Sequence, residues 1–210
     1  MAAALYDPEQ GYYARGTRQV GGAGDFFTSV SVGPLFGKLL ARRFLAFWRE
    51  AGMPPRWRIV ECGAHDGSLA ADVLGELRDL GAGASDALEY VIAEPLAALR
   101  DCQTEKLREF ADCCRILPDT GTLENDPLPG IAYGNEVLDA LPCHLLVRRN
   151  GGWLERAVDS GDGGLRWLEM EIADPALASA AEGLGEDFPE GYSTEIRTCY
   201  RDFLAVPARA

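Results

Sequence analysis

The sequence has few basic side chains for its length. Its 210 residues carry 20 lysines and arginines against 33 aspartates and glutamates, which gives a formal net charge of −13 at pH 7. Because binding to nucleic-acid phosphates requires a basic surface, this balance argues against a nucleic-acid partner. Most of the acidic excess lies in residues 111–210. There it would suit a cationic partner, or it would simply form a charged surface that keeps the chain soluble.

Histidine and paired cysteines are also scarce. Only His65 and His144 are present, and the six cysteines contain no C-x-x-C pair. Structural zinc sites are built from clusters of these residues, so the sequence predicts no metal site. We expect the cysteines to be reduced and buried, as in a cytoplasmic protein.

Long apolar runs are absent. No segment approaches the ~18 consecutive apolar residues that span a bilayer, and the first ten residues lack both the basic region and the apolar core of a secretion signal. Hydrophobic residues at 47% and charged residues at 25% are ordinary values for a globular protein and exclude wholesale disorder. We therefore expect a soluble cytoplasmic chain without a membrane span.

The chain's central part alternates between short apolar strands and helices. After an irregular segment, a helical pattern begins at Pro34 and stops at Gly52. Expected strands then cover residues 57–62, 88–94, 113–117 and 131–135, with helices over 67–81 and about 96–111. This alternation predicts an α/β fold, in which helices cover both faces of a parallel sheet.

The alternation of strands and helices ends after Pro142. The glycine-rich turns N-G-G and S-G-D-G-G separate apolar stretches over residues 144–172, which predicts an antiparallel hairpin or meander. A last helix is expected from about Thr194 to Val206. The predicted organisation has four parts: an irregular segment and helix (1–52), a cofactor-binding α/β core (53–142), a β-hairpin insertion (143–190) and a helix (191–210).

The strongest local signal is a glycine-containing loop between a strand and a helix. The strand ends at Glu61, and Gly63 and Gly67 follow before the helix begins. Glycines allow a sharp turn and a close backbone approach, and helix N-terminal amides favour an anionic ligand group. The dinucleotide fingerprint G-x-G-x-x-G is not met, because His65 stands where a second glycine would be. The loop is therefore either a ligand-binding loop or a turn that only helix packing requires.

Two further strand ends carry acidic residues. Glu94 ends the second expected strand, where a carboxylate can accept hydrogen bonds from a ribose diol, unless it is merely a surface side chain. The fourth strand leads into Asn135, Glu136 and Asp139. A short helix there would place the two carboxylates on one face. Together with the amide oxygen they would form an acceptor-only site for an amine or guanidinium, or they would only complement a helix dipole.

Seven motifs occur in an order that resembles the MidA family of S-adenosylmethionine-dependent methyltransferases, which includes a mitochondrial complex I assembly arginine methyltransferase. The motifs are YDPEQGYY (6–13), GDFFTS (24–29), PLFGKLLA (34–41), IVECGAHDGSLA (59–70), YVIAEPLAALRDCQ (90–103), GNEVLDALP (134–142) and GGWLERAV (151–158). The resemblance implies a class I methyltransferase-type α/β fold, a doubly wound, Rossmann-like sheet. It also implies that the chain corresponds to the N-terminal half of family members, truncated at the C-terminus.

The resemblance also implies a cofactor, S-adenosyl-L-methionine, and the residues that would contact it. These are Asp25, Thr28, Glu61, Gly63, Ala64, Asp66, Gly67, Glu94, Pro95 and Asn135. The methionine part would lie over the glycine loop with its amine near Glu61, and the ribose would meet Glu94. Asn135, Glu136 and Asp139 are the implied catalytic residues, which would orient a guanidinium on a protein substrate. The eukaryotic relatives in this family are mitochondrial.

One residue departs from the family pattern, and two other functions stay open. His65 replaces a glycine usual in the cofactor loop, so its side chain should narrow the approach to the backbone. A nicotinamide-dependent oxidoreductase would also use a glycine loop and an acidic strand end, although the missing fingerprint weighs against it. The other alternative is a non-catalytic, cofactor-binding assembly or scaffold protein that keeps the fold without turnover.

Overall fold

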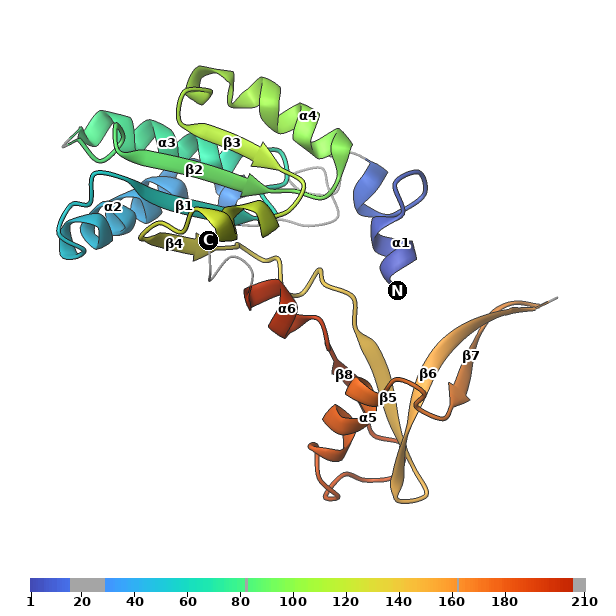
Figure 1. Cartoon of the computed structure of the whole chain (residues 1–210). Coiled ribbons are helices and arrows are strands. Elements are labelled where there is room, and N and C mark those ends of the chain that lie inside the picture. Colours follow the sequence, from blue (N-terminus) through green and yellow to red (C-terminus); the bar gives the residue numbers. More distant parts are fainter. Residues whose placement is uncertain (16–28, 82, 162, 206–210) are drawn as a thin grey trace. The chain divides into compact units, whose positions relative to one another are not determined.

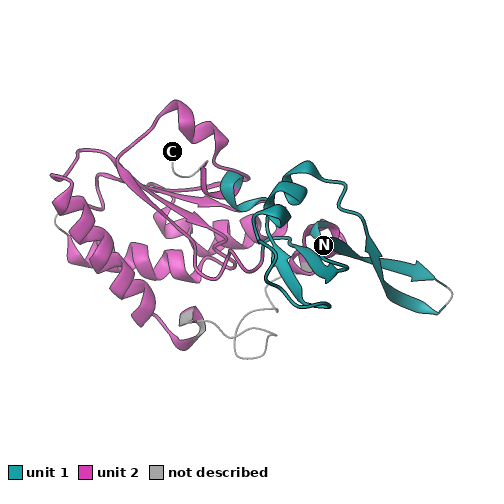
Figure 2. Ribbon diagram, turned by 90° about the horizontal axis from the view of Figure 1, so that it is seen from below, with its two compact units in different colours: residues 1–2, 141–202 teal, residues 3–140, 203–210 magenta. Residues whose placement is uncertain are grey.

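The chain forms two compact units. A computed structural model describes residues 1–15, 29–81, 83–161 and 163–205 (Figure 1). One unit consists mainly of residues 3–140, and the other mainly of residues 141–202 (Figure 2). The candidate residues Asp25 and Thr28 lie outside the described residues. Among the described helices, none has the length and apolar character needed to cross a membrane.

The larger unit contains a parallel sheet of four strands in the order β3-β2-β1-β4. The strands are β1 (Trp57–Cys62), β2 (Leu88–Ala93), β3 (Cys114–Leu117) and β4 (Gly130–Tyr133). The helices of this unit include α1 (Ala2–Tyr6), α2 (Leu35–Glu50), α3 (Ser68–Leu80) and α4 (Ala97–Lys106), with short 3-10 helices at Tyr13–Arg15, Ser29–Val32, Arg108–Phe110 and Gly121–Asn125. The predicted α/β alternation is confirmed, and the strand boundaries agree within two residues.

Helices α2 and α3 cover one face of this sheet. Every residue of β1 is buried, as expected for a central strand of a parallel sheet. Alternate strand residues point to opposite faces, and those facing α2 and α3 form the main core. Its members include Phe44, Trp48, Trp57, Ile59, Val73, Leu77, Tyr90 and Ile92. A smaller cluster with Val60, Val91 and Leu123 lies on the opposite face.

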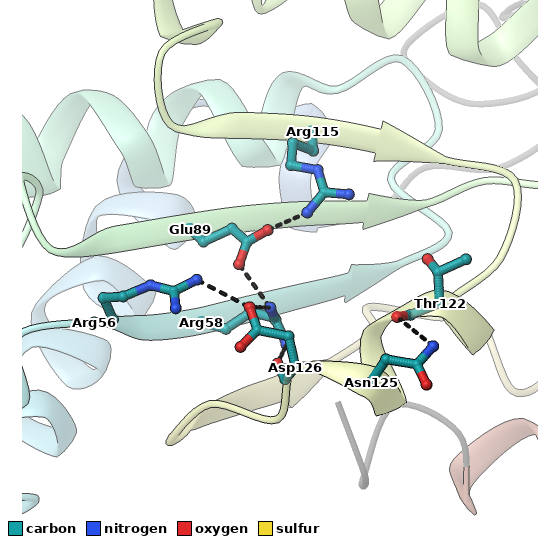
Figure 3. Close-up of polar contacts among 7 residues, drawn as sticks. All are labelled: Arg56, Arg58, Glu89, Arg115, Thr122, Asn125 and Asp126. Atoms are coloured by element: carbon teal, nitrogen blue, oxygen red, sulfur yellow. Dashed lines mark hydrogen bonds and ion pairs between the residues drawn. The ribbon is translucent and has the colours of Figure 1, made fainter.

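A buried arginine on that opposite face is part of a charged network across strands β1, β2 and β3. Arg58 in β1 is 2% exposed, and its Nε and Nη2 atoms donate to Glu89 Oε2 in β2 at 3.0 and 2.7 Å (Figure 3). Its Nη1 donates to the main-chain carbonyl of Asp126 at 2.8 Å. Arg115 of β3 also pairs with Glu89, and Arg56 pairs with the Asp126 carboxylate at the surface. Burial alone would raise the pKa of Glu89, but the two guanidinium groups hold it below its ordinary value.

The smaller unit contains an antiparallel sheet in the order β7-β6-β5-β8. Its strands are β5 (His144–Arg149), β6 (Gly152–Gly161), β7 (Gly164–Met170) and β8 (Ser193–Ile196). The first three form the meander that the glycine-rich turns predict. Helix α5 (Pro175–Glu182) has Asp174 as its N-cap, and its Leu177 packs in a small core with Leu146 of β5.

Two expectations are wrong here, and one helix was not expected. The helix predicted from Thr194 to Val206 is replaced by β8 and a shorter helix α6 (Tyr200–Ala205). The side chains of β8 alternate between exposed and half-buried, and the strand pairs with β5, so period-2 burial outweighs local helical preference. Helix α5 was not expected. All six cysteines are free, but only Cys62 is fully buried; the other five are half-buried.

Candidate functional site

The loop after β1 is built from left-handed backbone. Gly63 and Gly67 have φ values of +71° and +82°, a region that residues with a Cβ avoid. A Cβ on Gly63 would also lie 2.8 Å from Val137 Cγ2, because the loop after β4 packs directly against it. The two glycines thus serve the turn itself and the close approach of two strand-end loops.

His65 takes a glycine-like conformation in the middle of this loop. Its φ is +48°, and its Nε2 atom is buried without a hydrogen-bond partner among the described residues. Burial lowers the pKa of His65, so the neutral imidazole is favoured. The predicted narrowing by this side chain therefore comes with backbone strain, which a glycine would not have.

Asp66 fixes the start of helix α3. Its Oδ1 atom accepts from the Ser68 amide at 3.0 Å, its Oδ2 atom accepts from the Ser68 hydroxyl at 2.9 Å, and Lys106 forms an ion pair with it. Burial opposes ionisation, but these partners lower the pKa of Asp66. Ala64, in the same loop, is buried, with 6% of its surface exposed. Asp66 therefore orders the loop through contacts that the chain itself supplies.

Glu94 comes directly after β2 and is 4% exposed. Its Oε1 atom accepts from the Leu96 amide at 3.0 Å, and its Oε2 atom accepts weakly from Gln103 Nε2 at 3.5 Å. Burial raises its pKa despite these bonds. Arg100 donates to the carbonyls of Glu94 and Pro95 and so holds the main chain at this strand end. The carboxyl is fixed in place with lone pairs left for a ligand.

Glu61, near the carboxyl end of β1, belongs to a buried polar cluster. It is 2% exposed, its Oε2 atom accepts from the Tyr90 hydroxyl at 2.5 Å, and the Tyr90 and Tyr133 hydroxyls are 2.5 Å apart. Burial raises the pKa of Glu61 to about 7, although the tyrosine hydrogen bonds oppose the shift. Neither tyrosine was expected at the site; a polar-tipped aromatic side chain within a predicted strand of the sheet is the signal that marks each of them.

The loop after β4 does not contain the expected short helix. Glu136 has φ +52°, and residues 138–140 form a turn, so the spacing of Glu136 and Asp139 is not that of two positions on a helix face. The left-handed residue breaks the helical path before it can begin. Both carboxylates are exposed, and neither forms a hydrogen bond or ion pair with the described residues; Asn135 is half-buried.

Tyrosines from the N-terminal segment lie beside this loop. The Tyr6 hydroxyl donates to the Ala140 carbonyl at 2.8 Å, and the Tyr6 and Tyr13 rings stack with centroids 5.4 Å apart. Burial and the negative charge of Asp139 together raise the pKa of Tyr13. An aromatic pair therefore lies near a carboxylate that has no hydrogen bond or ion pair with the described residues, a combination that suits a cationic group.

The structure brings three strand-end loops of the larger unit together. The Gly63 amide donates to the Ala93 carbonyl beside Glu94 at 3.3 Å, and Val137 packs on Gly63. The carboxyl edge of a parallel α/β sheet is where such folds bind ligands. A buried carboxyl, a left-handed glycine loop and a buried His65 nitrogen without a partner among the described residues fit a nucleoside ligand with a diol.

We expect replacement of His65 by glycine to preserve or improve affinity for a nucleoside ligand of this site. The free energy of unfolding should rise by up to about 1 kcal/mol, because glycine relieves the left-handed backbone strain. Replacement by alanine removes the same imidazole but keeps a Cβ, so this variant should be less stable than the glycine variant. Thermal unfolding and calorimetric titration measure both effects. A large loss of affinity in both variants would instead identify His65 as a specific ligand contact.

Comparison with protein families gives one match that covers most of the chain. The family model described as "Putative S-adenosyl-L-methionine-dependent methyltransferase" matches residues 39–210. Among solved structures, a Burkholderia thailandensis protein bound to S-adenosyl-homocysteine is similar, with 34% identity and a TM-score of 0.74. That match covers 93% of this chain and 50% of the Burkholderia chain.

Curated relatives show the same partial coverage. The mitochondrial protein arginine methyltransferase NDUFAF7 of Danio rerio is 31% identical over 201 residues, which is 86% of this chain and 47% of the relative. The Drosophila melanogaster homologue is 33% identical over 182 residues, 78% of this chain and 41% of the relative. The chain thus spans about half the length of the relatives that it matches.

Proposed function

The chain belongs to the MidA-like family of S-adenosylmethionine-dependent methyltransferases, and from this we propose that it binds S-adenosylmethionine and methylates arginine on a protein substrate. The observation that carries the proposal is the meeting of three strand-end loops at the carboxyl edge of the sheet, with the buried Glu94 on one of them. The proposal that the methyl acceptor is arginine is supported by the names of distant relatives and by the acidic loop after β4.

In this proposal, different residues of the chain bind different parts of the cofactor. The left-handed loop at Gly63 and Gly67 would let the methionine part approach the backbone, and Glu94 would accept hydrogen bonds from the ribose. Glu61, buried in β1 just before this loop, would favour binding of the cofactor's positively charged amine. When bound, the cofactor supplies an electrophilic methyl group, and the protein contributes mainly by positioning the acceptor.

The acceptor would lie near the loop after β4. Glu136 and Asp139 would orient a guanidinium by charge-assisted hydrogen bonds, and the amide oxygen of Asn135 would add a neutral acceptor. The stacked Tyr6 and Tyr13 rings near Asp139 support a cationic group at this position. The acidic balance of the chain would favour basic protein partners over nucleic acid.

Two binding measurements test the proposal against its alternatives. S-adenosylhomocysteine should raise the thermal unfolding temperature of the chain, whereas NAD at the same concentration should not, because only a ligand of the folded state stabilises it. Stabilisation by NAD alone would favour the oxidoreductase. Binding of S-adenosylhomocysteine without methyl transfer to any arginine-containing protein would favour the non-catalytic scaffold. The cytoplasmic location expected from the sequence stays a prediction, since the named relatives are mitochondrial.

Replacement of Glu94 by alanine should weaken S-adenosylmethionine binding more than tenfold. Hydrogen bonds to a charged group contribute about 1.5–3 kcal/mol each, and the variant loses those to the ribose. It also leaves the buried Leu96 amide without its acceptor, so a modest loss of stability should accompany the loss of affinity. Glutamine at this position keeps the shape and one acceptor, and should retain more affinity. Calorimetric titration measures both, and an unchanged dissociation constant in the alanine variant would remove Glu94 from the site.

A further inference from the structure

We propose that Gln103 is a positioning residue, which holds the glycine loop and the Glu94 carboxyl in the arrangement that the cofactor requires. The inference rests on the proposed function and deepens it by adding a residue that does not itself contact the ribose. Gln103 lies in the middle of α4, and its side chain is fully buried, with 0% exposure.

One amide group of Gln103 contacts both strand-end loops. Its Nε2 atom donates to the main-chain carbonyl of His65 at 2.8 Å, and the same atom lies 3.5 Å from Glu94 Oε2. The first contact fixes the strained, left-handed residue of the glycine loop. The second is a weaker contact, at 3.5 Å, with the carboxyl oxygen that the Leu96 amide does not hold. Gln103 therefore joins the loop after β1 to the loop after β2 through a single donor group.

The rest of α4 supports the same loop at neighbouring points. Lys106 donates to Asp66 and, at 2.7 Å, to the Ser68 hydroxyl. A Cβ on Gly67 would be 3.4 Å from Leu107 and 3.5 Å from the Gln103 side chain, so the helix packs directly on the loop. These contacts hold the loop as a whole, whereas only Gln103 among them also reaches Glu94.

Stability alone does not account for a glutamine at this position. Gln103 belongs to the apolar stripe that includes Leu99 and Leu107, and its Oε1 atom is buried with no hydrogen-bond partner among the described residues. A buried acceptor without a partner is unfavourable, and this cost offsets much of what the bond to the His65 carbonyl contributes to stability. What an apolar side chain cannot supply is the donor that links His65 to Glu94.

The test replaces Gln103 by methionine, which keeps the length and apolar volume of the side chain but removes the donor. We expect affinity for S-adenosylhomocysteine to fall about five- to twentyfold, because the ligand must then order the Glu94 carboxyl and the loop itself. The thermal unfolding temperature without ligand should change little, because removal of the unpartnered Oε1 atom offsets loss of the bond to the His65 carbonyl. Thr104→Ala is the matched control: Thr104 lies next to Gln103 on the exposed side of α4, its hydroxyl donates to the Arg100 carbonyl at 2.7 Å, and its loss should leave affinity unchanged.

A double-mutant cycle separates positioning from a general effect on the fold. If Gln103 acts through Glu94, the methionine substitution should cost clearly less affinity in a Glu94→Gln background than in the wild-type chain. Gln103→Glu adds a pH signature. Protonated, this side chain can still donate to the His65 carbonyl; ionised, it repels Glu94. Its affinity relative to wild type should therefore fall by tenfold or more as the pH rises and be partly restored at low pH.

A measurement without ligand keeps the inference independent of the proposed function. Hydrogen exchange at the Gly67 and Ser68 amides should be at least fivefold faster in Gln103→Met, because the loop loses its anchor at His65. Unchanged exchange, or wild-type affinity in the methionine variant, would overturn the role of Gln103. A wild-type chain that binds no S-adenosylhomocysteine would contradict the proposed function instead, and the exchange result would still decide whether Gln103 holds the loop.

Discussion

Replacing Arg58 by methionine is expected to destabilise the chain by about 3 kcal/mol. Arg58 is the buried member of an ion-pair network, and removing one partner of a buried pair leaves the other partly uncompensated. Glu89 would keep only its pair with Arg115, and the Asp126 carbonyl would lose its donor. Methionine fills much of the apolar volume, so the lost interactions rather than a cavity account for the effect. Urea unfolding measures it.

Arg56→Met is the matched control for this prediction. Arg56 pairs with Asp126 at a similar distance of 3.0 Å, but its side chain is 62% exposed, so the change should be below about 1 kcal/mol. Equal effects of the two substitutions would show that burial does not determine the strength of this network.

The network also gives a pH dependence. Because the folded-state pKa of Glu89 lies below its ordinary value of 4.5, its contribution is present above that pH and is lost as the pH falls through the folded value. The difference between wild type and Arg58→Met should therefore shrink in acid.

The sequence predicted the larger unit well because each of its elements has a simple local signature. The short segment WRIVEC, mostly apolar and bounded by Pro55 and Gly63, marks β1, and periodic leucines followed by Gly81 mark α3. The smaller unit was harder to predict where tertiary pairing decides the structure. Residues 193–196 become a strand only because β5 offers an edge to pair with, which no local pattern reveals.

For the candidate site, the sequence identified the strand-end positions but not what surrounds them. Glu94 and the glycine loop follow from the order of strands and helices, since parallel strands end at one edge. The contacts of Gln103 and of Tyr90 depend on which helix and strand lie alongside, and so they required the structure. The conformation of Glu136 was also missed, because a left-handed residue other than glycine leaves no signature in the sequence.

Replacing Asp139 by asparagine is expected to reduce arginine methylation by roughly two orders of magnitude and to leave cofactor affinity nearly unchanged. Asp139 lies in the turn after β4, whereas the proposed ribose and methionine contacts lie on the loops after β1 and β2. A charge that acts mainly on the guanidinium in the transition state contributes a few kcal/mol, which appears in turnover rather than in cofactor binding. Asparagine keeps the size of the side chain and one acceptor, so it isolates the charge.

Two measurements on each variant make this prediction decisive. Calorimetric titration with S-adenosylhomocysteine reports cofactor affinity, and transfer of a labelled methyl group to an arginine-containing protein reports turnover. Asp101→Asn, which neutralises an exposed acid on α4, is the control for the change in net charge and should alter neither quantity. Equal losses of affinity and turnover in Asp139→Asn would place Asp139 in the cofactor site. Undiminished turnover would remove it from acceptor recognition, and the exposed Glu136 would then be the remaining carboxylate of this loop able to orient a guanidinium.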